Sequence, residues 1–180
     1  MIVHQSTKDL LRFLQTHPEV RSRIKAAHDR TVLYSGGFFK PMWKEIQTDP
    51  ELADKQSMEY VLKRLILPGN RCGTLADYVQ AALRDVDRDN VDAQANRDII
   101  WRALSGIFAS NATGKVSFQV GSGVSDASGP DGKRNVFAAT EISVLLRNPK
   151  VDATTKDLLA YFQRCIQSKQ ANINLGFISA

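Results

Sequence analysis

The stretch ANRDIIWRALSGIFASNATGKVSFQVGSG, residues 95–123, decides the fold because it joins a helix to a strand. Residues 95–112 form the longest helical candidate of the chain. Gly114 ends the turn that follows, and residues 115–123 alternate between apolar and polar side chains as a half-buried strand does. The stretch therefore predicts a helix that leads directly into a strand.

Further elements are expected on both sides of this stretch. Ser6 or Thr7 can cap a helix that runs to about Thr16, Pro18 can begin a second helix, and Thr74 can cap a third. The remaining helices are expected at 41–47, 50–67 and 153–169, and the remaining strands at 31–37 and 172–179. Helices followed by alternating strands and helices predict an α/β or α+β fold.

We expect one domain over residues 1–180, because this length suits a single domain. Its first part, to about residue 110, is mostly helical, and its second part, about 111–180, contains the sheet. A cleft between two such parts is a common place for a small-molecule site. The 43% hydrophobic residues suffice for a core, and no apolar run approaches the roughly 20 residues of a membrane span.

The charge and the polar residues exclude several classes of function. The net charge of +5 and pI of about 9.3 suit an anionic partner, but the Lys and Arg residues form no run typical of nucleic-acid binding. Cys72 and Cys165 lie in no metal-binding motif, so we expect no metal and two reduced cysteines. The three histidines all lie in the first helical region, which argues against a Ser/His/Asp hydrolase.

Four segments hold residues that can carry chemistry. Residues 136–146, VFAATEISVLL, contain one charge in a mostly apolar run, and a carboxylate buried there is costly unless it is paired or used. The turn after the first strand offers an aromatic ring, a hydroxyl group and exposed backbone N–H groups, which can hold a phosphate. The candidates are Glu141 and Phe137, Tyr34, Ser35 and Gly36, Glu59 in SMEYVL, and Trp101 with Ser105 one helical turn later.

In order and spacing, these segments resemble the ADP-ribosyl cyclase family of NAD glycohydrolases and cyclic ADP-ribose hydrolases. The similar segments are VLYSGG, SMEYVL, IIWRALSGIFASNATG, KVSFQVGSG, NVFAATEI and the closing DATTKDLLAYFQRCIQSKQANINLGFIS. Tyr34 stands where animal members have Trp, Gly36 stands where they can have Arg, and almost all of the disulfide cysteines are absent. This pattern is similar to a trimmed bacterial NAD-degrading toxin domain.

The resemblance implies an ADP-ribosyl cyclase-like fold and cleavage of the nicotinamide–ribose bond of NAD, or of NADP, without a cofactor or metal. Adenine attack would give cyclic ADP-ribose, and water attack would give ADP-ribose. It implies that Glu141 is the catalytic carboxylate and that Ser105 lies against the ribosyl intermediate. The other implied contacts are Trp101 and Tyr34 with the nicotinamide end, Glu59 with the carboxamide, Ser35 and Gly36 with the pyrophosphate, and Phe137 with the nucleotide.

Such a toxin would act in the cytoplasm, for instance that of a target cell after delivery as part of a larger secreted protein. A producer must restrain it, so a cognate immunity protein, acidic to complement the +5 charge, is the expected partner; membrane and nucleic acid are not. Two alternatives remain open at this point: a basic module that binds nucleic acid or protein, and a ribonuclease-type toxin.

Overall fold

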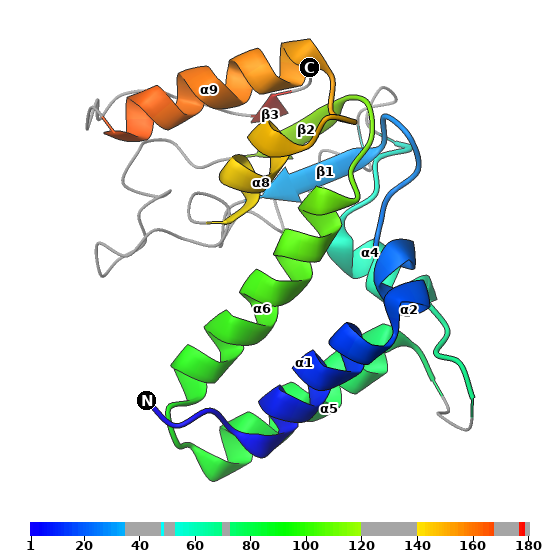
Figure 1. Ribbon diagram of the computed structural model, residues 1–180, viewed down its shortest axis with the longest axis vertical. Coiled ribbons are helices and arrows are strands. Elements are labelled where there is room, and N and C mark those ends of the chain that lie inside the picture. Colours follow the sequence, from blue (N-terminus) through cyan, green and yellow to red (C-terminus); the bar gives the residue numbers. More distant parts are fainter. Residues whose placement is uncertain (35–47, 49–52, 70–72, 120–139, 168–176, 179–180) are drawn as a thin grey trace.

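The structure is a computed structural model that describes residues 1–34, 48, 53–69, 73–119, 140–167 and 177–178. It is a mixed fold of helices and one small sheet (Figure 1), as the order of expected elements predicts. The described helices are α1 (Gln5–Thr16), α2 (Pro18–Arg23), α4 (Met58–Arg64), α5 (Leu75–Asp89), α6 (Ala93–Ser110), α8 (Ile142–Arg147) and α9 (Ala153–Gln167).

The sheet combines strands from both parts of the chain. Its described strands are β1 (Thr31–Tyr34), β2 (Val116–Gln119) and β3 (Phe177–Ile178), in the order β1-β2-β3. β1 pairs with β2 in parallel, from Thr31 opposite Val116 to Tyr34 opposite Gln119, and β3 pairs with β2 antiparallel. The parallel pairing brings the first 34 residues against the strand that follows α6, so the sheet joins the two parts of the domain.

Local signals set the ends of several helices. Thr74 caps α5 in a capping box with Asp77, and Pro18 is the first residue of α2, as the sequence predicts. α1 begins earlier than expected, because its cap is the ring of His4, whose Nδ1 accepts a hydrogen bond from the backbone N of Ser6 at 3.1 Å.

The helix expected over residues 50–67 is wrong in its first part. α4 begins only at Met58, after Ser57, whose Oγ accepts a hydrogen bond from the backbone N of Tyr60 at 3.2 Å. Gln56 does not join the helix, because it forms a parallel bridge with Thr31. The backbone N of Gln56 donates to the carbonyl of Arg30 at 2.7 Å, and the backbone N of Val32 donates to the carbonyl of Gln56 at 3.2 Å. This long-range pairing excludes helix at Gln56.

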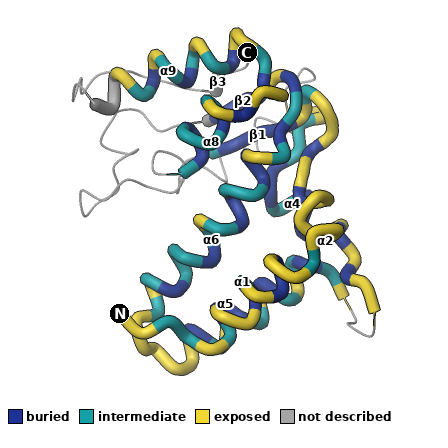
Figure 2. Tube along the Cα trace, in the orientation of Figure 1, coloured by how far each residue is buried: buried dark blue, intermediate teal, exposed yellow. Residues whose placement is uncertain are grey.

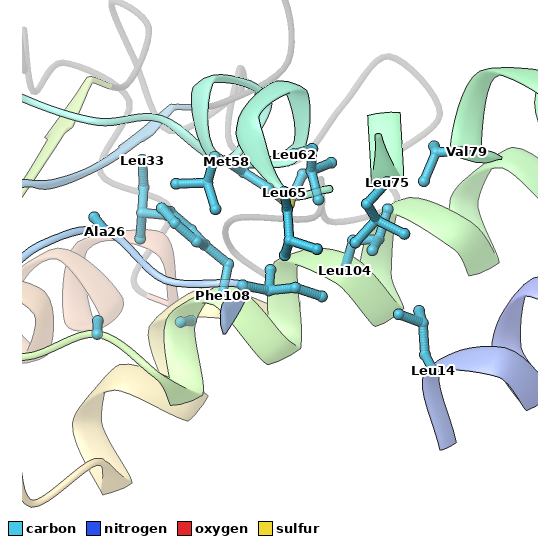
Figure 3. Close-up of a cluster of buried hydrophobic side chains, with 14 of the residues drawn as sticks. Leu14, Ala26, Leu33, Met58, Leu62, Leu65, Leu75, Val79, Leu104 and Phe108 are labelled. Atoms are coloured by element: carbon cyan, nitrogen blue, oxygen red, sulfur yellow. The ribbon is translucent and has the colours of Figure 1, made fainter. Parts of the chain in front are cut away.

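The core forms around α6, which is fully buried at Ile100, Leu104 and Phe108. Figure 2 shows this buried side along α6, and α6 packs against α1, α5 and α8. Figure 3 shows side chains of β1, α4 and α6 gathered in one cluster, among them Leu33, Met58, Leu104 and Phe108. The same core therefore holds the end of β1 and the start of α4 against the middle of α6. No helix in the described ranges has the length and apolar character needed to cross a membrane.

Asn148, at the end of α8, fastens that helix to the end of α6. Its buried Nδ2 donates to the carbonyl oxygens of Ala109 at 3.1 Å, Ser110 at 3.1 Å and Ala112 at 2.9 Å. These carbonyls lie at a helix end, where backbone acceptors lack partners within the helix. The side chain thus closes the end of α6 and fixes α8 beside it.

We predict that Asn148→Ala lowers the free energy of unfolding by about 1–3 kcal/mol, because three hydrogen bonds are lost and the buried carbonyl of Ala112 is left without its donor. Urea denaturation of the two proteins measures the difference. Asn90→Ala would not be a fair control, because Asn90 has a left-handed backbone (φ 50°). Ser110→Ala is suitable, since the exposed Ser110 hydroxyl bonds only within α6. A loss equal to that of this control would contradict the prediction.

Candidate functional site

Tyr34 and Glu59 meet because two segments run side by side before them. Thr31 and Gln56 are paired, and Tyr34 and Glu59 each lie three residues further along. The Tyr34 hydroxyl donates a hydrogen bond to Oε1 of Glu59. Tyr34 is the last residue of β1, and Glu59 lies in the first turn of α4, where the helix dipole favours a carboxylate. The pair therefore lies at the carboxyl end of β1, the end of a parallel strand at which ligands commonly bind.

Ser105 and Glu141 come from α6 and from the turn that leads into α8. Both are buried, with 4% and 5% of their surface exposed. The turn approaches α6 closely: a Cβ atom added to Gly106 would lie 3.5 Å from the Thr140 methyl group. The Ser105 hydroxyl is near enough to Glu141 to favour its ionised form. The residue that the sequence singles out as an isolated acid is thus buried beside α6.

Burial governs the ionisation of Glu141. Loss of water, the largest effect, and the nearby negative charge of Glu59 raise the pKa of Glu141 from its usual 4.5 to about 8, against the opposing hydrogen bond from Ser105. Burial, Glu59 and Glu141 together raise the pKa of the Tyr34 hydroxyl. These effects place Tyr34, Glu59 and Glu141 within electrostatic reach of one another, so with Ser105 they make up a four-residue site, which we call the acidic site.

Met58 is a neighbour of the acidic site that the sequence did not single out. Its Sδ lies 3.9 Å from Oγ of Ser105 and can accept the hydroxyl proton. A thioether is a weak acceptor and a carboxylate is a strong one, so the Ser105 hydroxyl is available to a stronger acceptor. The sequence could have indicated Met58, because it directly precedes Glu59 and is buried on the apolar side of α4.

The other predicted residues divide into two groups. Trp101 lies on α6 one turn before Ser105, is half-buried and packs against the hydrophobic core. It therefore stands next to the acidic site along the helix, as the spacing of four residues predicts. Ser35, Gly36 and Phe137 lie outside the described residues, as does Cys72.

The arrangement suits a cationic ligand. It offers two carboxyl groups, one of which is buried, and among the described residues the charge that acts on Glu141 is that of another acid. Because Glu141 is only 5% exposed, water screens it little, and a positive group placed beside it would interact strongly. No group of three His, Cys, Asp or Glu side chains within the described ranges could hold a metal ion. Comparisons of the chain with protein-family models, curated proteins and solved structures found no match.

We predict that the stability of the protein falls between about pH 5 and pH 8 because of Glu141. With its pKa raised to about 8 in the folded protein, Glu141 holds a proton that it loses on unfolding over this range. Its contribution declines by up to about 1.4 kcal/mol per pH unit, and the decline ends above pH 8, where both states are ionised.

Glu141→Gln removes this titration, so the difference in unfolding free energy between variant and wild type should shift in favour of Gln as pH rises from 5 to 8. Urea denaturation at several pH values measures it, and Glu19→Gln on the exposed side of α2 is the matched control. Parallel stability curves for wild type and Glu141→Gln would refute the prediction.

Proposed function

We propose that the protein is an NAD glycohydrolase with an ADP-ribosyl cyclase-like fold, which cleaves the nicotinamide–ribose bond of NAD. The observation that carries the proposal is the acidic site, in which the buried Glu141 lies near Ser105, Glu59 and Tyr34. Four residues that the family resemblance assigns to substrate come together there from β1, α4, α6 and the start of α8.

The chemistry requires one carboxylate near a developing positive charge. The nicotinamide of NAD is a pyridinium cation and a good leaving group, so the bond breaks without an acid to protonate it. Positive charge then develops on the ribose, and a carboxylate that is already in place stabilises it. Water adds to the anomeric carbon and loses one proton, giving ADP-ribose, nicotinamide and a proton; adenine addition instead gives cyclic ADP-ribose.

Each residue of the site then has a role. Glu141 bonds the ribose hydroxyl groups and faces the developing charge, and the cationic substrate favours its ionised form. Ser105 holds that carboxylate. Trp101 stacks on the pyridinium, an attraction of about 0.5–2 kcal/mol. Ser35, Gly36 and Phe137 contact the rest of the dinucleotide in this proposal. No metal or cofactor takes part, and NADP would enter if the 2′-phosphate has room.

The direct test is incubation of the purified protein with NAD, with nicotinamide, ADP-ribose and cyclic ADP-ribose separated by chromatography. We expect nicotinamide release, and a loss of about 100-fold or more in Glu141→Gln, the size of effect that follows removal of one transition-state stabilising group. Glu19→Gln should keep full activity. Full activity in Glu141→Gln would overturn the assignment, and salt-dependent nucleic-acid binding without NAD cleavage would favour a basic binding module instead.

The proposal extends to a toxin that depletes NAD in the cytoplasm of a target cell and is restrained by an acidic immunity protein. Support comes from a basic hollow of about 430 Å³ between the end of α2, the end of α6 and the segment after α8. It is lined by Lys25, His28 and Lys150, with Ser22, Ala26, Ala27, Asn111 and Thr113. Of the described acidic residues, none forms an ion pair with Lys25 or Lys150.

Expression of the chain alone should lower cellular NAD and stop growth, and co-expression of the immunity protein should restore growth. Lys25→Glu with Lys150→Glu should weaken that protection while leaving NAD cleavage in the purified protein unchanged, because the two lysines lie outside the acidic site. Growth unaffected by a chain that cleaves NAD when purified would contradict the toxin proposal, and undiminished protection would exclude the hollow as the contact.

A further inference from the structure

The Tyr34–Glu59 pair has features that the resemblance does not supply. Family members of animals carry a Trp at the position of Tyr34, and an indole ring donates only through its ring nitrogen. Here the phenolic hydroxyl donates to Oε1 of Glu59, from a ring that is itself half-buried at the end of β1. The hydrogen bond joins two backbone segments already fixed by the Thr31–Gln56 pairing, so its geometry is set before any ligand binds.

The second oxygen of Glu59 is in a different situation. Oε2 is buried, and no group among the described residues donates a hydrogen bond to it. A buried acceptor without a donor is costly, and the cost is greater for a carboxylate than for a neutral group. Oε1 already accepts a hydrogen bond from Tyr34. A ligand with an N–H or O–H group could therefore donate to Oε2 and remove the free-energy cost of leaving this atom unpaired.

We propose that Tyr34 is a positioning residue that holds Glu59 by Oε1 and leaves Oε2 as the selective acceptor for an N–H group of the substrate. The inference rests on the proposed function, in which the substrate's pyridinium carries a carboxamide. It makes the hydroxyl of Tyr34, a group that does not touch the substrate through this bond, a determinant of specificity for carboxamide-bearing dinucleotides. A site that bonds a substrate N–H rejects analogues that lack it, because its own polar group is then left unpaired.

The pairing is tested first in the unliganded protein. A phenolic proton held by a carboxylate exchanges slowly with water and resonates downfield in the proton NMR spectrum. We expect one such signal in the wild type, absent in Tyr34→Phe and shifted upfield in Glu59→Gln. Tyr60→Phe is the matched control, because Tyr60 is the neighbour of Glu59 on α4 and stacks on Arg64 with its ring. A wild-type spectrum without the signal, or a signal unchanged in Glu59→Gln, overturns the pairing.

The selectivity is tested with NAD and its 3-acetylpyridine analogue, in which a methyl ketone replaces the carboxamide and removes its N–H donors. Tyr34→Phe keeps the aromatic ring and should lower kcat/KM for NAD by about tenfold or more, the scale of a hydrogen bond to a charged group. It should lower kcat/KM for the analogue much less, so the preference for NAD shrinks. Tyr60→Phe should leave the preference unchanged.

A double-mutant cycle shows whether Tyr34 acts through Glu59. In the Glu59→Gln background, Tyr34→Phe should have little further effect on the preference for NAD, since its partner carboxylate is gone. Independent effects that multiply in the double variant, or equal losses for both substrates, overturn the inference while NAD cleavage stands. If the wild type cleaves neither dinucleotide, the proposed function and the selectivity fall together, and the NMR result alone decides the pairing.

Discussion

The burial of α6 is the constraint on which the rest of the structure depends. Ile100, Leu104 and Phe108 are inaccessible to solvent along its length, and an 18-residue helix with such a buried side needs neighbours over its whole span. α1 and α5 cover its first part, β1 and α4 pack against its middle and end through the cluster in Figure 3, and α8 lies beside its end. Elements from far apart in the sequence are therefore placed relative to one helix.

The acidic site follows from the same packing, because its residues are sequence neighbours of core residues. Leu33 precedes Tyr34, Met58 precedes Glu59, Leu104 precedes Ser105, and Ile142 follows Glu141. These four core residues are 7% exposed or less. Their tight packing fixes the backbone on which each polar side chain is carried. The core thus sets the backbone positions from which the polar side chains extend, as a preorganised site requires.

How far the sequence predicts this arrangement depends on the range of the interactions. The start of α5 follows from Thr74 and Asp77 alone, and the start of α2 follows from Pro18, since caps and prolines act within one turn. The predicted start of α4 was wrong because Gln56 pairs with Thr31. Local sequence preferences cannot reveal a contact between residues so far apart in the chain. For the site, the resemblance selected Tyr34, Glu59, Ser105 and Glu141, which lie near one another in the structure. The other selected residues Ser35, Gly36 and Phe137 lie outside the described residues. The hydrogen bond between Tyr34 and Glu59 required the structure.

The acidic site lowers the stability of the fold, which indicates that its residues serve a function. A buried carboxyl near a second acid opposes folding whenever both are ionised, and a core built only for stability would hold apolar residues there. The protein instead bonds Glu59 with the Tyr34 hydroxyl from β1 and places the Ser105 hydroxyl from α6 near Glu141, and neither hydroxyl adds positive charge. No positive charge among the described residues offsets the burial of Glu141, so this side chain keeps its proton in the unliganded protein up to about pH 8. A neutral ligand would leave Glu141 in this protonated form, whereas a cationic ring placed beside it would favour the carboxylate, which the proposed cleavage of NAD requires.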